Sequence, residues 1–506
     1  MRFESLWALA PGTIPTLCAL CMVPATTWAA TLQVGPGKPH ATLSSAVAAA
    51  VSGDVIEVDS GMYDDDIVSI DSKNLTIRGV GDMRPHFRAT APIPNGKGII
   101  VALGTTELVV ERLEFSGAVV VDDNGAGIRM QGASLVVEDC LFHDNQNGIL
   151  AGAGASPYTA QIRHSEFHHN GIPGGDGQQH NVYIGDYPTL LVFEGNYSHH
   201  AYSGQALKSR ALENHVLYNR LMDEADGTSS YLIDLSQGGL AYVVGNVIQQ
   251  GPMASNHSTI IAYKPEGPTN PDLRLFVVNN TIVNDNVEGL DPAFVRVWAA
   301  TDVVLRNNIF VGWGTPLLLD GGAAPSVIDE YNLHIDDPGL VDRAGYDYRL
   351  VDGSVAIDAA GAPGSDGAFD LTPTKHYVQP AGTEPRPEVD ALDIGAYEFG
   401  MGPPAGDDGG TGGSDGGTGD AGDGTGLDAT GADSTGDDGS TSAAADDTGV
   451  GSDGGTTGAE QDGDAGGCAC TADPHRSPAW FAAPIAALAL RRRRAAAGSV
   501  DPRGLR

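Results

Sequence analysis

Basic residues are scarce in this chain. It has 28 Lys and Arg against 65 Asp and Glu, which gives a formal net charge of -37 at pH 7. Such a surface repels nucleic acid and anionic membranes at long range, so a nucleic-acid-binding function is excluded and any site for a polyanion must be locally basic. The charge is uneven, because residues 401–467 hold 15 acidic residues and no basic one.

Cysteine is also rare, and only Cys140 lies in the body of the chain. The other four lie near the ends: Cys18, Cys21, Cys468 and Cys470. A lone cysteine cannot form an internal disulfide, so a packed core must hold residues 31–400 together. Charged residues make up only 18% of the chain, whereas Gly and Pro number 69 and 30. This composition argues against a helical architecture.

Two segments outside the body have the composition of targeting and linker sequences. Residues 1–30 begin with Arg2, continue as an apolar run and end with small residues around a cleavage point after Ala29. This predicts a secretory signal peptide, with an uncleaved membrane anchor as the alternative. Residues 401–467 are almost entirely Gly, Asp, Thr, Ser and Ala. They cannot bury enough apolar surface to fold, so we expect a disordered, self-repelling linker.

The final segment, residues 468–506, combines cysteines, an apolar run and a basic cluster. Its parts follow in the order Cys468-Ala469-Cys470, Ala479–Leu490 and Arg491–Arg494. The apolar run is shorter than the ~20 residues of a membrane span. The order of parts resembles the myxobacterial carboxy-terminal surface-sorting signal, which implies a processed tail. A tail anchor with a stop-transfer arginine cluster is the alternative. Either places the body at the cell surface or outer membrane, or releases it outside the cell.

A short pattern recurs through the body: an apolar strand, an Asn or small residue, any residue, and a large apolar residue. Its instances begin at Cys140, Ser165, Asn196, Asn219, Asn246, Asn280, Asn308 and Asn332. The spacing averages about 27 residues, which is typical of a solenoid. Short β-branched strands precede each instance, so the solenoid is all-β. We therefore predict a right-handed parallel β-helix, like that of pectate lyases, over residues 31–400, with the Asn column as a turn ladder.

Both ends of this solenoid carry candidate caps. Thr42–Val51 predicts a short helix that covers the first coil and hides its open edge. Near the other end, Tyr348–Leu350, Ser354–Ala359 and Asp393–Glu398 predict a terminal cap. We expect the domain to be a monomer.

Five segments predict one strip of outward side chains along the stack. They are His180–Gly185, Gln205–Ser209, Tyr231–Leu235, Ile260–Lys264 and Phe294–Trp298. Period-two alternation places the following side chains inside: Val182, Ile184, Leu207, Ile233, Leu235, Val295 and Val297. The outward set is then Asn181, Tyr183, Lys208, Asp234 and Arg296.

One strand of this strip resembles the polysaccharide lyase family that includes chondroitinase B and the β-helical alginate lyases. The matching residues are Leu207-Lys208-Ser209, followed by Asn214 and Asn219. The resemblance implies that Lys208 is the base that removes the C5 proton of a uronic acid during β-elimination. The sequence departs from the family twice: Leu232–Gln237 lacks its arginine, and Ala201–Gln205 replaces its acidic calcium ligands.

Elimination also requires a cation beside the developing charge. Arg210 or Arg296 is the candidate for this cation, and we assign Arg210, His180 and Tyr183, near Lys208, as further catalytic residues. We assign substrate binding to Asn181, Asp234, Tyr263 and Arg296. A Lys208–Asp234 salt bridge on a solvated face is the alternative interpretation. The corresponding alternative function is a noncatalytic surface protein that binds glycans or adheres to neighbouring cells.

Two groups of residues are candidate metal ligands. His143, His168 and His199 occupy the same position in successive repeats, so they stack and could bind a transition metal or form a polar ladder. A local acidic turn could bind Ca2+, the cofactor we consider, or remain solvated; its members are Asp223, Glu224 and Asp226.

Overall fold

The computed structural model describes residues 29–104, 106–152, 157–185, 188–267, 269–289, 292–387 and 390–401. The expected signal peptide, linker and sorting segment therefore lie almost entirely outside the described residues. Within them, no helix has the length and apolar character needed to cross a membrane.

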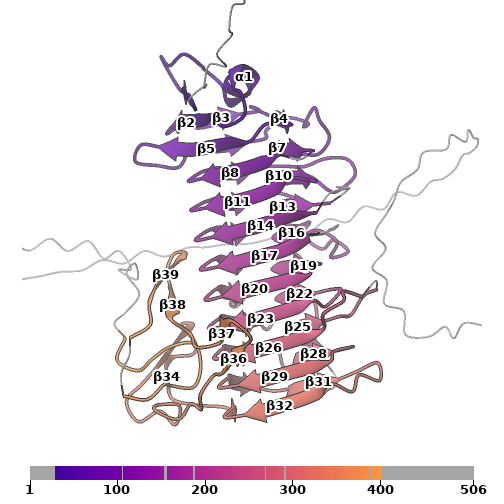
Figure 1. The fold of residues 1–506 in the computed structure, drawn as a ribbon, viewed down its shortest axis with the longest axis vertical. Helices are drawn as coiled ribbons and strands as arrows, with labels where there is room; N and C mark the ends of the chain where they lie inside the picture. Colours follow the sequence, from indigo (N-terminus) through magenta and orange to yellow (C-terminus); the bar gives the residue numbers. More distant parts are fainter. Residues whose placement is uncertain are drawn as a thin grey trace, which may run out of the picture. The chain divides into compact units, whose positions relative to one another are not determined.

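The described chain forms a right-handed parallel β-helix built from three sheets (Figure 1). Sheet A contains β1 (Thr31–Val34), β2 (Val55–Asp59), β5 (Leu75–Val80), β8 (Glu107–Glu111), β11 (Ser134–Glu138), β14 (Tyr158–Arg163), β17 (Pro188–Glu194), β20 (Glu213–Leu217), β23 (Leu240–Val244), β26 (Arg274–Val278), β29 (Asp302–Arg306) and β32 (Ser326–Glu330). Sheet B contains β3 (Met62–Asp64), β6 (His86–Arg88), β9 (Glu114–Ser116), β12 (Leu141–His143), β15 (Glu166–His168), β18 (Tyr197–His199), β21 (Arg220–Met222), β24 (Val247–Gln250), β27 (Thr281–Asn284), β30 (Ile309–Gly312) and β33 (Leu333–His334). Sheet C contains β4 (Val68–Asp71), β7 (Gly98–Leu103), β10 (Ala126–Gln131), β13 (Asn147–Ala151), β16 (Val182–Ile184), β19 (Leu207–Ser209), β22 (Ile233–Leu235), β25 (Thr259–Tyr263), β28 (Ala293–Val297) and β31 (Thr315–Leu319).

The predicted Asn column is a buried ladder at the corner between sheets A and B. Each backbone N–H donates to the side chain one coil further on, as from Asn196 to Asn219 Oδ1 at 2.9 Å and from Asn219 to Asn246 Oδ1 at 2.9 Å. Ser165 and Cys140 continue it toward the amino terminus. The residue before each ladder position has a left-handed backbone: Asp139, His164, Gly195, Tyr218, Gly245, Asn279, Asn307 and Tyr331. This conformation turns the chain from one sheet to the next, and the ladder satisfies the amides at the corner.

Aliphatic and aromatic side chains fill the interior in columns. All seven residues expected to point inward in the five-strand strip are fully buried. In sheet B the rings of Phe115, Phe142 and Phe167 stack on successive coils with centroids 5.0 and 4.9 Å apart. Cys140 is buried beside this column, and burial raises the pKa of its thiol to about 12. This cysteine therefore packs as a small apolar side chain.

The predicted amino-terminal cap is present. Helix α1 (Leu43–Ala49) begins after Thr42, whose side chain accepts a hydrogen bond from the Ser45 N–H at 3.2 Å. Its apolar face buries Leu43, Ala46 and Val47. The helix thus covers the interior of the first coil, as the sequence predicts.

The predicted carboxy-terminal cap is wrong in its position. Three hairpins follow the solenoid: β34 (Leu340–Asp342) with β35 (Asp347–Leu350), β36 (Ser365–Asp366) with β37 (Phe369–Asp370), and β38 (Lys375–Val378) with β39 (Gly382–Pro385). Tyr348, Ile394 and Tyr397 from this region pack on Val247 and Val283, which lie on the outer face of sheet B. The last strand of sheet A, β32, is exposed along its whole length.

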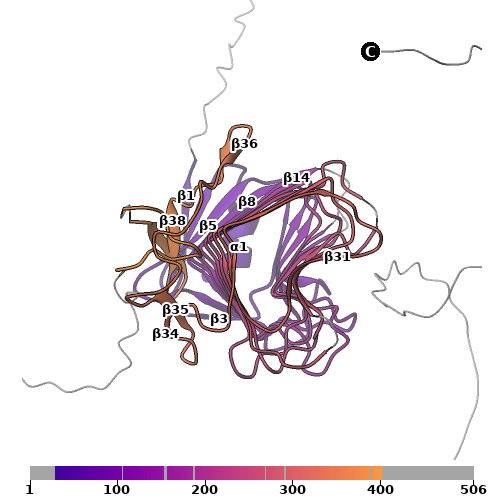
Figure 2. The same ribbon diagram turned by 90° about the horizontal axis from the view of Figure 1, so that it is seen from below.

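Apolar residues on the outside of the solenoid explain why the carboxy-terminal segment packs on its sides and not over its end. Tyr242, Val244 and Phe276 on the outer face of sheet A pack with Leu371 and Phe369. The carboxy-terminal segment therefore runs back along the sides of sheets A and B, on the side opposite β31 (Figure 2).

Candidate functional site

The outer face of sheet C contains the predicted strip. Parallel pairing places Tyr183 beside Lys208, Lys208 beside Asp234, and Asp234 beside Ala262. Arg296 follows Ala262 on β28. Four of the five residues expected to face outward therefore form one column across adjacent coils.

Asn181 is the exception, because it faces the corner and not the strip. It is fully buried and donates to the Phe167 carbonyl at 3.2 Å and the Ser198 hydroxyl at 3.1 Å. It also accepts from the Asn170 amide at 3.0 Å. It precedes β16, where period-two alternation does not yet apply, so it belongs to a second polar ladder and cannot contact a substrate in this geometry.

Lys208 makes two ion pairs in a nearly buried position. Its Nζ lies 2.8 Å from Glu266 Oε1 and 3.5 Å from Asp234 Oδ2, and its side chain is 4% exposed. The sequence predicts the pair with Asp234 as an alternative, but places it on a solvated face, whereas the structure buries it. Two adjacent carboxylates stabilise the ammonium form of the lysine.

The two carboxylates differ in their protonation. Burial raises the pKa of Asp234 to about 6, although Lys208 opposes this shift. Asp234 Oδ1 has no hydrogen-bond partner among the described residues, which agrees with a disfavoured carboxylate. Burial would also raise the pKa of Glu266, but Lys208 and Arg210 lower it overall. Glu266 is therefore the charged partner at mildly acidic pH, and Asp234 takes up the first proton.

Arg210 and Tyr183 complete a cluster around Lys208. Arg210 Nη2 donates to Glu266 Oε2 at 2.8 Å. The Tyr183 ring centroid lies 5.6 Å from Lys208 Nζ and 5.4 Å from Arg210 Cζ, within the range of cation–π contacts. The sequence does not identify Glu266, because it comes from the loop after β25 and carries no repeat spacing.

His180 lies beneath this cluster as a neutral imidazole. Its side chain is buried, and Nδ1 accepts the Gln205 N–H at 3.1 Å. Burial lowers its pKa well below the ordinary value, and the charges of Lys208 and Arg210 lower it further. Its ring meets that of Tyr183 edge-on at 5.4 Å. His180 therefore supports Tyr183 and is not exposed to a ligand.

The predicted binding residues on the last coils have different environments. Arg296 pairs with Asp320 at 2.5 Å, and its Cζ lies 5.0 Å from the ring of the partly exposed Trp298. Tyr263 is a correction: it is fully buried, and its hydroxyl donates to the Gly239 carbonyl at 2.7 Å. Alternation along β25 points Tyr263 into the core, so it has no access to a substrate.

The predicted histidine column exists on the outer face of sheet B. The rings of His143 and His168, and those of His168 and His199, lie 5.1 Å apart between centroids. Burial, reinforced by neighbouring histidines, lowers the pKa of His168 to about 4 and that of His199 to about 3. Their nitrogens do not converge on one point. Among the described residues, one group of three possible metal ligands has atoms that do converge: His86, Glu114 and His143.

The acidic turn after β21 does not bring its three carboxylates into one group among the described residues. Asp223 is buried and accepts the N–H groups of Ser229 and Gly251 at 3.1 and 3.4 Å. Glu224 accepts the Tyr197 hydroxyl, and Asp226 pairs with His200 at 3.1 Å. The three carboxylates therefore have separate partners.

Comparisons with known proteins add a similarity of fold only. No protein-family model matches the chain, and no curated protein matches its sequence. Among solved structures, the chain is similar to the crystal structure of pectate lyase Pel9A, with a TM-score of 0.41 and 14% sequence identity. The match covers 74% of this chain and 97% of that one.

Proposed function

We propose that the outer face of sheet C binds a uronic-acid polysaccharide and cleaves it by β-elimination. The observation that carries this proposal is the convergence of Lys208, Arg210 and Tyr183 on the outer face of sheet C. Cationic groups suit the carboxylates of a uronate, and aromatic rings suit the faces of sugars. Glu266 and Asp234 balance the charges of Lys208 and Arg210, so the cluster becomes locally basic, as a polyanion requires, only when a substrate carboxylate displaces Glu266.

In the reaction, Lys208 accepts the C5 proton, the C4–C5 double bond forms, and the bond from C4 to the departing glycosidic oxygen breaks. That oxygen takes up a proton as it leaves. Arg210 stabilises the charge that develops on the uronate carboxylate. Lys208 must first lose a proton and release Glu266 Oε1, now 2.8 Å away. Substrate binding near Glu266 would have to drive this change.

A second function is favoured by the ion pairs themselves. Lys208 is held by two carboxylates, and Arg296 stacks on Trp298 as it pairs with Asp320. Such a surface can bind a glycan without releasing a base. The alternative is therefore a noncatalytic glycan-binding or adhesion protein that uses the same face.

Incubation of the full chain with alginate, pectate, chondroitin and heparin-type polymers, with and without Ca2+, distinguishes the two. Elimination creates an unsaturated uronate that absorbs ultraviolet light. We expect absorbance to rise with one polymer and to be lost in Lys208→Ala. The matched control is Lys38→Ala. It removes a 3.5 Å surface ion pair between Lys38 and Asp59, both of which lie far from Lys208 in the sequence. Polymer binding without absorbance, by a folded protein, would establish the noncatalytic function.

Cell-surface display is a further part of the proposal. It rests on the sequence of the two ends, with Cys468 and Cys470 before the apolar run. Protease treatment of intact cells should remove the body from the wild type. In Cys468→Ala/Cys470→Ala we expect the body in the medium or inside the cell, and unchanged surface exposure would exclude a sorting role for these cysteines.

A further inference from the structure

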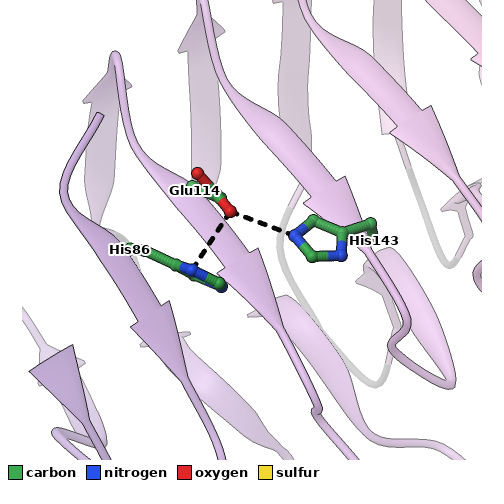
Figure 3. Close-up of side chains that lie close together, drawn as sticks. All are labelled: His86, Glu114 and His143. Atoms are coloured by element: carbon green, nitrogen blue, oxygen red, sulfur yellow. Dashed lines mark hydrogen bonds and ion pairs between the residues drawn. The ribbon is translucent and has the colours of Figure 1, made fainter. Parts of the chain in front are cut away.

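Three side chains on consecutive coils of sheet B converge above its outer surface (Figure 3). His86 lies on β6, Glu114 on β9 and His143 on β12. His86 pairs in register with Glu114, and His143 lies one coil beyond. All three side chains are partly buried. The β-helix itself thus fixes their spacing.

The atoms that face each other are two imidazole nitrogens and one carboxylate oxygen. Glu114 Oε1 lies 3.1 Å from His86 Nδ1 and 3.1 Å from His143 Nε2. The three ligand atoms all lie within 4.8 Å of one another. A zinc ion binds nitrogen and carboxylate oxygen at roughly 2.0–2.2 Å. The separations therefore leave room for one ion between the three atoms after small side-chain movements.

The other nitrogen of each histidine has its own partner. His86 Nε2 is 2.7 Å from the Ser116 hydroxyl, and His143 Nδ1 is 2.7 Å from Asp144 Oδ2. These contacts leave His86 Nδ1 and His143 Nε2 to face Glu114. Metal-binding histidines characteristically have such outer partners, which fix the ring orientation and strengthen the ligand.

We propose that His86, Glu114 and His143 bind a divalent transition metal ion of the zinc type. Two imidazoles and one carboxylate form a donor set typical of zinc, and three protein ligands leave a coordination position for water or a ligand oxygen. The contacts that now join the three side chains are replaced by bonds to the ion, and Asp144 and Ser116 retain their contacts. The site is separate from the sheet C cluster and does not depend on the proposed lyase activity.

The neighbouring histidines do not offer the same geometry. His168 Nδ1 contacts His169 Nδ1 at 3.0 Å, and His199 Nδ1 contacts His200 Nδ1 at 2.6 Å. His199 Nε2 contacts Glu166 at 3.2 Å. Their nitrogens point to separate partners, so the metal site includes only the first member of the histidine column that the sequence predicts.

Metal titration of the chelator-treated full chain tests the proposal. The titrations use a Cys468→Ser/Cys470→Ser background, because thiolates bind zinc tightly. We expect one Co2+ per chain, with a visible absorption band that Zn2+ displaces. Glu114→Gln and His143→Gln should abolish the band. Asp144→Asn should weaken binding roughly 10–100-fold, as expected for an outer partner.

Two histidine variants provide matched controls. His164→Gln removes a histidine whose Nδ1 lies 2.5 Å from Glu138 without a third ligand, and His199→Gln removes a member of the stacked column. Both should bind Co2+ like the parent chain. Thermal unfolding in chelator identifies any variant that fails to fold. The proposal is overturned if the parent binds no Co2+ stoichiometrically, or if folded Glu114→Gln retains the band.

Discussion

Lys208 and Glu266 are 58 residues apart in the sequence, yet Lys208 Nζ donates to Glu266 Oε1 at 2.8 Å. Lys208 lies on β19, a regular strand of sheet C, whereas Glu266 lies in the loop after β25, two coils later. The loop therefore determines whether the lysine is available to a substrate. This relationship links stability and function in the candidate site.

The Lys208–Glu266 pair should be strongly coupled in unfolding. A double-mutant cycle of Lys208→Met and Glu266→Gln should give a coupling free energy of about 1–3 kcal/mol, because the pair is largely removed from water. Denaturant unfolding of the four proteins measures it. The same cycle on Lys38 and Asp59, which are about one-third exposed, should give less than about 1 kcal/mol. Equal coupling in both pairs would contradict burial of Lys208.

Asp234 should make stability fall between about pH 4 and pH 6. Its pKa in the folded state is raised from 3.8 to about 6, so the folded state holds this proton more tightly than the unfolded state. The contribution of Asp234 to the free energy of unfolding is therefore complete below pH 3.8 and is lost as the pH rises through about 6. Relative to wild type, Asp234→Asn should gain up to about 3 kcal/mol over this range.

Asp320→Asn is the control of opposite sign. A hydrogen bond from Arg296 lowers the pKa of Asp320, so its stabilising contribution is present above pH 3.8 and is lost as pH falls. Asp320→Asn should therefore lose stability relative to wild type as pH rises, the reverse of Asp234→Asn. Urea unfolding at several pH values compares both variants with wild type, and parallel curves for Asp234→Asn and wild type would refute the raised pKa.

The fold could be predicted from the sequence because each coil repeats the same corner residue and the same alternation of inward and outward side chains. Asn219 and Asn246 recur at the same corner, and Ile233 and Leu235 alternate inward on the next sheet. Repeat spacing and period-two alternation report these features directly. The same reasoning, extended to the aromatic residues at Phe87 and Phe115, would have placed His86 in register with Glu114, and His143 on the next coil two residues past the partner of Glu114.

The rest of the candidate site depends on contacts that no repeat encodes. Glu266 reaches Lys208 from an irregular loop, and the alternation rule fails at Asn181 because that residue lies in a corner. The course of the carboxy-terminal segment depends on apolar residues outside the solenoid, such as Val247 and Val283. In a sequence these are indistinguishable from core residues.

The Asn ladder should contribute strongly to stability. Asn219 donates from Nδ2 to the Phe193 carbonyl at 2.7 Å and to Asn246 Oδ1 at 2.9 Å, and accepts from the Asn196 N–H. Asn219→Ala leaves these buried partners unsatisfied and should lower the free energy of unfolding by about 2–4 kcal/mol. The exposed Asn74, whose Oδ1 accepts from Glu107 N–H, gives the control Asn74→Ala. Equal losses in denaturant unfolding would argue against the ladder.

His180 should make the protein sensitive to acid below its ordinary pKa of 6.5. Burial lowers the pKa of His180 in the folded state, so the folded protein keeps this imidazole neutral while the unfolded chain takes up the proton. The stabilising contribution is therefore complete above pH 6.5 and is lost as pH falls toward the folded pKa, by about 1.4 kcal/mol per pH unit. His180→Asn cannot bind this proton, so the wild type should lose stability relative to it as pH decreases. Urea unfolding of both proteins from pH 7.5 to pH 5 measures the difference between their free energies of unfolding. A difference that does not change with pH would mean that His180 is solvated. Solvent would then also have a route to Tyr183 and Lys208.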